Sequence, residues 1–66
     1  MGAFKVVREH IVKTFAVNEV EAHRHALAYL RVVEAKMGHA VVFDDAAFQA
    51  LERHLETQAG LQRLPR

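Results

Sequence analysis

The fold of this chain is decided by residues 18–37, which read NEVEAHRHALAYLRVVEAKM. Asn18 can cap a helix with its side-chain oxygen, and Glu21 stands at the third helical position, from which a carboxylate can reach back to the cap. Gly38 follows, where a residue in the left-handed conformation commonly ends a helix. These start and stop signals predict one long, uninterrupted helix.

Apolar side chains recur at helical spacing along this segment and form one stripe. A helix this long in so short a chain needs packing partners outside itself, so we predict that the stripe is the seam of a homodimer. The predicted seam consists of Ala22, Ala26, Tyr29, Leu30, Val33 and Met37. The two alanines would let helices approach closely, whereas Leu27 and Val32 lie off the stripe and indicate contacts on a second side.

The preceding segment, residues 3–16, fits two secondary structures. Its valines, isoleucine and phenylalanines have high β propensity, but a strand would mix charged and apolar side chains on one face. On a helix, one apolar face is formed by Phe4, Val7, Ile11 and Phe15. We predict a helix, and the alternative is an α+β fold in which an N-terminal strand or hairpin precedes two helices.

Residues 40–43 are apolar and too few for a helix, so they form either a buried connector or a short strand. A third helix is predicted from an aspartate cap, Asp44 or Asp45, to about Ala59. Its apolar face consists of Ala47, Phe48, Leu51 and Leu55. The connector therefore separates two helices and continues neither of them.

The end of the chain carries its own stop signals. Gly60 can end the third helix, with Leu61 folding back against it. The remainder contains Pro65, and we expect residues 61–66 to fray. No repeat or domain boundary is visible, so residues 1–66 are predicted to form a single small all-α domain of three helices, the middle one longest.

Composition narrows the classes of function. A chain of 66 residues without cysteine has a marginal core and no disulfide to staple it. Its hydrophobic fraction of 52% is high for such a domain and favours an interface with another chain over a lone monomer. The net charge is only +1, with dispersed basic residues, which is not typical of nucleic-acid binders. No apolar run approaches the roughly 20 residues of a membrane span, so we expect a cytoplasmic protein.

Catalytic patterns are weak in this sequence. Cysteine and serine are absent, and the remaining hydroxyls, those of Thr14, Thr57 and Tyr29, stand in no recognisable triad or elbow. The three glycines form no phosphate-binding loop. We therefore expect neither enzymatic activity nor a cofactor.

Five histidines raise the questions of metal binding and pH sensing. His23 and His25 point roughly 200° apart on a helix and cannot chelate one ion together. Each has a glutamate four residues before it, Glu19 or Glu21, but a zinc or di-iron site needs three or four ligands. We assign no metal ligand and keep a metal-dependent module as the second alternative. His23, which borders the stripe, is the best candidate for a pH sensor.

DNA binding is the first alternative function. The third helix would present Gln49, Arg53 and His54 outward, where they could contact base edges. However, the connector is longer than the turn of a helix-turn-helix. Acidic residues of the same helix, such as Glu52 and Glu56, would also repel phosphates.

The favoured function is that of a non-enzymatic protein–protein interaction or regulatory module acting as a homodimer. Apolar excess without a catalytic pattern is the observation behind it. Its expected partners are a second copy of the chain and possible further proteins, and a membrane is not expected among them.

Overall fold

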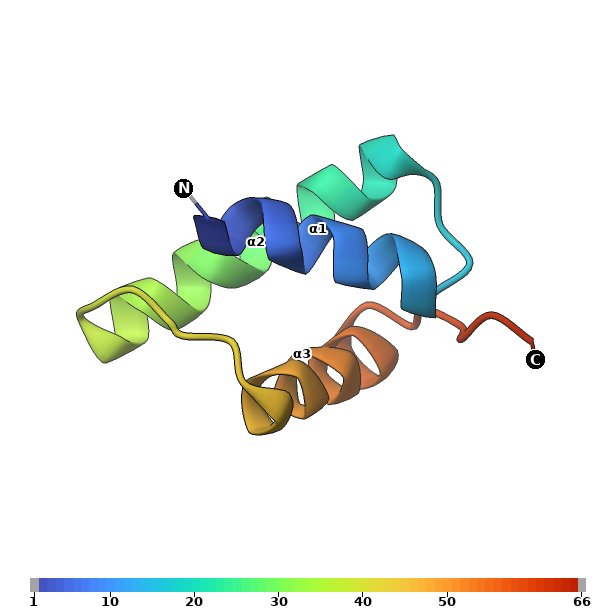
Figure 1. Cartoon of the computed structure of the whole chain (residues 1–66). Coiled ribbons are helices and arrows are strands. Elements are labelled where there is room, and N and C mark those ends of the chain that lie inside the picture. The colour runs from blue at the N-terminus through green and yellow to red at the C-terminus, as the bar shows by residue number, and fades with distance from the viewer. Residues whose placement is uncertain (1, 66) are drawn as a thin grey trace.

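Three helices make up the structure, a computed structural model that describes residues 2–65 (Figure 1). They are α1 (Gly2–Thr14), α2 (Glu19–Met37) and α3 (Asp45–Gln58). Within the described residues, the only β-type pairing is an isolated bridge between Phe15 and Arg63. The all-α prediction is therefore confirmed, and the α+β alternative is wrong. No helix of this part of the chain combines the length and the apolar character needed to cross a membrane.

Side-chain caps and a glycine set the helix ends as the sequence predicts. The Asn18 side chain accepts a hydrogen bond from the Glu21 N–H at 2.8 Å. Asp44, and not its neighbour, caps α3 in the same way, at 2.9 Å from the Ala47 N–H. Gly38 ends α2 with φ 80°, a conformation that glycine adopts readily because it has no Cβ. The long helix therefore begins and ends at its predicted signals.

Residues 40–43 form no strand, so of the two forms that the sequence leaves open they take that of a connector between α2 and α3. Its Val41 N–H donates a hydrogen bond to the Glu34 carboxylate at 3.2 Å, which satisfies the backbone without a second strand. Phe43 packs against the core, whereas Val42 is 86% exposed. The connector is thus an extended link tied to the last turns of α2.

The core lies where the three helices meet (Figure 1). Its buried side chains are Val7, Ile11, Phe15, Ala22, Ala26, Tyr29, Leu30, Leu51 and Leu55. Phe4 and Phe48, which the helical spacing also assigns to apolar faces, are partly buried at its edge. The spacing that predicts a helix at residues 3–16 therefore also identifies the side of it that is buried.

The apolar stripe of α2 packs inside the chain. Four of the six residues predicted to form a dimer seam are at most 9% exposed, because they belong to the core shared with α1 and α3. These four are Ala22, Ala26, Tyr29 and Leu30. Val33 is partly buried, and only Met37 is largely exposed, at 55%. A second copy cannot reach the four buried residues while α1 and α3 hold these positions.

The segment after α3 returns to the end of α1 (Figure 1). The Leu61 N–H donates back to the Leu55 carbonyl at 3.1 Å, so the predicted turn after the helix is present. The Leu64 N–H then donates to the Thr14 carbonyl at 2.9 Å. The described residues of this segment make these contacts with α1 and α3, and the fraying of residues 61–66 stays a prediction; position 66 lies outside the described residues.

The difference in burial between two valines predicts different effects of their substitution on stability. Val7→Ala should lower the free energy of unfolding by about 1–3 kcal/mol, because it removes methyl groups from an enclosed site. Val42→Ala is the matched control, since that side chain is 86% exposed. It should change the free energy by less than about 0.5 kcal/mol. Urea unfolding followed by circular dichroism measures both, and equal losses would contradict this core.

Tyr29 is the only tyrosine, and tryptophan is absent, so ultraviolet absorbance follows its titration alone. Burial raises the pKa of Tyr29 above its ordinary value of 10.0. Because folding raises this pKa, its contribution to stability is complete below pH 10.0 and is lost as the pH rises through the folded pKa. We expect phenolate to form at higher pH in the folded protein than in guanidinium. Coincident titration curves would show that the ring is solvated.

Candidate functional site

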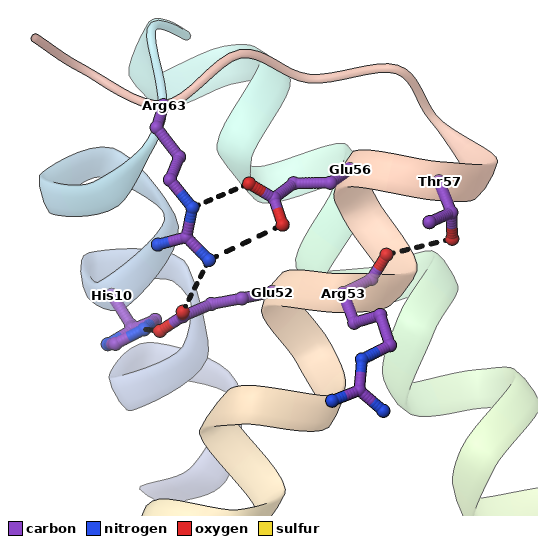
Figure 2. A network of polar contacts seen from close by, with 6 residues as sticks. All are labelled: His10, Glu52, Arg53, Glu56, Thr57 and Arg63. Carbon is purple, nitrogen blue, oxygen red and sulfur yellow. Dashed lines mark hydrogen bonds and ion pairs between the residues drawn. The ribbon is translucent and has the colours of Figure 1, made fainter.

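A network of three charged side chains and one histidine joins α1, α3 and the C-terminal segment (Figure 2). This charged network consists of His10, Glu52, Glu56 and Arg63. Glu52 lies at its centre, with Oε2 at 2.7 Å from His10 Nε2 and Oε1 at 2.9 Å from Arg63 Nη2. Arg63 Nε donates to Glu56 Oε2 at 2.5 Å. Because the two glutamates stand one turn apart on α3, a single arginine bridges both.

Aromatic rings support both ends of the charged network. The His10 imidazole stacks on the Phe48 ring, with 4.3 Å between centroids. The Arg63 guanidinium lies 5.8 Å from the centre of the Phe15 ring, within cation–π reach. Both side chains are thus held in place by packing, which reduces the entropy lost when the ion pairs form.

The contacts set the ionisation of two members of the charged network. Burial alone would raise the pKa of the Glu52 carboxyl, but hydrogen bonds from His10 and Arg63, with the Arg63 charge, outweigh it and lower that pKa. Hydrogen bonds to Glu56 and Glu52 raise the pKa of Arg63. Both groups are therefore held in their charged forms.

A hollow of about 460 Å³ lies beside the charged network. Its lining consists of His10, Lys13, Thr14, Glu52, Arg63, Leu64 and Pro65. Two groups of this lining are suited to proton transfer, His10 and Glu52. They are hydrogen-bonded to each other, and Glu52 also accepts a hydrogen bond from Arg63. The arrangement therefore acts as a clamp that holds the C-terminal segment against α1 and α3.

A second hollow, of about 380 Å³, is formed by residues of α1 and of the first turns of α2. Its lining consists of Arg8, Glu19, Val20, His23 and Arg24. The Phe4 ring contacts two of these side chains, since the Arg8 guanidinium lies 5.7 Å from its centre and the His23 ring meets it edge-on at 4.9 Å. We call this the cationic hollow, because its two arginines outnumber its one glutamate.

The side of α2 away from the core alternates apolar and cationic side chains. This outward row consists of Val20, Arg24, Leu27 and Arg31, spaced at i, i+4, i+7 and i+11 on one helix face. Val20 is 63% exposed and Leu27 is 38% exposed. Val32 is 62% exposed. With Leu27, it is one of the two residues from which the sequence predicts contacts on a second side of the helix. Because Val20 and Arg24 also line the cationic hollow, the row and the hollow are continuous.

The candidate DNA-contacting residues are all exposed on α3: Gln49, Arg53 and His54. Arg53 points away from the charged network (Figure 2), whereas His54 packs edge-on against Tyr29 at 5.1 Å. Two exposed carboxylates, Asp44 and Asp45, stand at the start of the same helix. The α3 surface is therefore mixed in charge, and DNA binding gains no specific support.

Within residues 2–65, no three histidine, aspartate or glutamate side chains converge as metal ligands. The glutamate and histidine pairs at the start of α2 stay separate two-residue fragments. His23 contacts Phe4 and lines the cationic hollow. The metal-dependent alternative gains no support from the described residues, and pH sensing by His23 stays a prediction.

Sequence reasoning misses the charged network, because its members come from distant parts of the chain. His10 and Glu52 are separated by 42 positions, and no local pattern indicates that they meet. One usable signal exists in the i, i+4 spacing of Glu52 and Glu56, which places two carboxylates on one face and suits a bridging arginine. That signal does not identify which arginine it is.

The chain matches no protein-family model, and neither a curated protein nor a solved structure is significantly similar to it. Similarity to a known protein therefore contributes nothing to the choice of function. The choice of function therefore depends on the charged network, the cationic hollow and the outward row.

The lowered pKa of Glu52 predicts an acid-dependent loss of stability. Glu52→Gln should reduce the free energy of unfolding at neutral pH by about 1–2 kcal/mol, because it removes two charge-assisted hydrogen bonds. The wild-type contribution is complete above the ordinary carboxyl value of 4.5 and is lost as the pH falls through the lower folded pKa. The difference between the two proteins should therefore shrink below about pH 4.

The matched control is Glu9→Gln, at an exposed position of α1. Its effect should stay within about 0.5 kcal/mol across the same range. Chemical unfolding at a series of pH values measures both variants. If Glu52→Gln lowered the free energy of unfolding by the same amount at every pH, the hydrogen bonds from His10 and Arg63 would not be the cause of the lowered Glu52 pKa.

Proposed function

We propose that this chain is a non-enzymatic interaction module that binds another protein through the outward row of α2. The observation behind the proposal is the exposure of Val20 (63%) and Leu27 (38%) on a helix whose opposite side is filled by the core. An amphipathic helix that leaves apolar side chains at regular spacing in solvent is suited to pack against a partner helix or groove.

The expected affinity is modest. Burying a valine and a leucine contributes about 1.5–3 kcal/mol each at most. Association costs at least about 4 kcal/mol in lost translational and rotational freedom, which offsets much of that gain. The peptide's own leucines add a gain of similar size, which leaves roughly 4–6 kcal/mol and a Kd of about 0.1–1 mM for a short peptide that covers only the outward row. A whole partner protein would add further contacts around this row.

A second copy is a less suitable occupant of the outward row. In an antiparallel pair centred on Leu27, Arg24 of one copy would come close to Arg31 of the other. In a parallel pair, each arginine would face its own counterpart. Like charges placed opposite one another oppose association. The homodimer stays a prediction that needs a surface other than this row or the buried stripe.

A neutral amphipathic peptide tests the proposed row. The probe carries leucines at i, i+4, i+7 and i+11, flanked by glutamines, and binding is followed by amide chemical shifts of the protein. Val20→Ser should weaken binding about 3- to 10-fold, because it removes apolar contact area. Val42→Ser is the matched control at another exposed valine, 86% exposed, and should leave binding unchanged.

Two results would contradict the proposal. One is binding that is insensitive to Val20→Ser, and the other is a set of shifted amides that lies away from α2. Sedimentation equilibrium of the protein without peptide checks self-association in the same samples. The facing arginines predict no self-association through this row, and a dimer weakened by Val20→Ser would assign the row to a second copy.

A further inference from the structure

We infer that the cationic hollow receives a carboxylate side chain of the bound protein, so that the partner segment is both acidic and amphipathic. This inference rests on the proposed function, because it assigns a chemistry to what the outward row binds. It is carried by the continuity of the hollow with that row through Val20 and Arg24.

The hollow has the size and the groups that a carboxylate needs. Its volume of about 380 Å³ exceeds the space that one aspartate or glutamate side chain fills. Arg8 and Arg24 line it, and a guanidinium binds a carboxylate through two parallel hydrogen bonds. A carboxylate seated there would meet a donor from α1 and a donor from α2.

Phe4 restrains two of the side chains that line the hollow before a ligand binds. Its ring lies 5.7 Å from the Arg8 guanidinium and 4.9 Å from the His23 ring, so one aromatic side chain restrains two of the lining groups. Side chains that are already restrained lose less entropy when a ligand arrives. Phe4 is itself packed against the core, which ties the hollow to the rigid part of the fold.

The charges around the hollow favour an acidic partner. Within residues 2–65, the ion pairs all belong to the charged network, and none involves Arg8, Arg24 or Arg31. Glu19 lies in the lining and opposes one positive charge, which leaves the arginines in excess. The outward row continues this pattern, since Arg31 follows Leu27 one turn further on.

A polypeptide fits this surface better than a nucleic acid. Val20 and Leu27 lie about 10.5 Å apart along the helix axis, the distance between side chains two turns apart on a partner helix. A phosphate backbone would gain little from these apolar side chains.

Three peptides with the same leucine spacing test the inference. Their flanking positions carry glutamate, glutamine or lysine, and each is titrated into the protein at low salt. The glutamate peptide should bind about 5- to 20-fold more tightly than the glutamine peptide, and the lysine peptide more weakly than both. Raising the salt to about 0.5 M should remove most of that preference, because screening shortens the range of the arginine charges.

Two variants locate the effect. Arg8→Gln combined with Arg24→Gln should reduce binding of the glutamate peptide to about that of the glutamine peptide. Arg53→Gln is the matched control, since it removes one exposed arginine from α3, and should leave the preference intact. Circular dichroism of each variant shows whether the helices are retained.

The outcomes separate the inference from the proposed function. Equal binding of the glutamate and glutamine peptides, both sensitive to Val20→Ser, would overturn the carboxylate site and leave the interaction surface standing. Absence of binding by all three peptides at millimolar concentration would overturn both. Duplex DNA that binds more tightly than the glutamate peptide, and in a way that depends on Arg24, would assign the hollow to phosphates and overturn the inference.

Discussion

The burial of one apolar stripe on α2 is the constraint on which the rest of the structure depends. This helix has 19 residues, and the two helices that cover its stripe have 13 and 14. Fully enclosed side chains of these two helices, among them Ile11 and Leu51, belong to the same core as the buried alanines of α2. The Cα radius of gyration is 11.1 Å, against about 10.8 Å for a compact chain of this length. The three helices of one chain therefore share a core, and no disulfide contributes to it because cysteine is absent.

Such a core is small, so the ends of the chain matter more than they would in a larger domain. The charged network joins residues that are far apart in the sequence, with His10 on α1, Glu52 on α3 and Arg63 beyond the last helix. Backbone hydrogen bonds between the C-terminal segment and the end of α1 act at the same place. The first and last parts of the chain are thus joined beside the core, and α1 and α3 cannot separate without breaking the His10–Glu52 hydrogen bond as well as apolar contacts.

Local signals explain what could be predicted from the sequence. Asn18, Asp44 and Gly38 act through atoms within a few residues of themselves, so the helix ends follow from the residues alone. Spacing along α1 likewise identifies its buried side. A stripe, however, shows only that a face is covered and does not show what covers it.

For that reason the α2 stripe suggests a dimer seam although α1 and α3 fill it. The charged network and the cationic hollow depend on which helices lie side by side, and no residue pattern encodes that directly. Arg8, Phe4 and Arg24 come together only because α1 packs against the first turns of α2.

The same packing gives the two sides of α2 different roles. The stripe is buried in the core, but hydrophobic residues make up 52% of the chain, and some of them lie outside the core. On α2, the exposed ones are Val20, Leu27 and Val32. Apolar side chains in solvent favour association, but arginines between them oppose pairing with an identical surface. Substitutions on the stripe should act on stability, and substitutions on the outward row should act on binding. Under the proposed function, stability and binding therefore depend on opposite sides of a single helix, so that a partner is selected by charge without any change in the core.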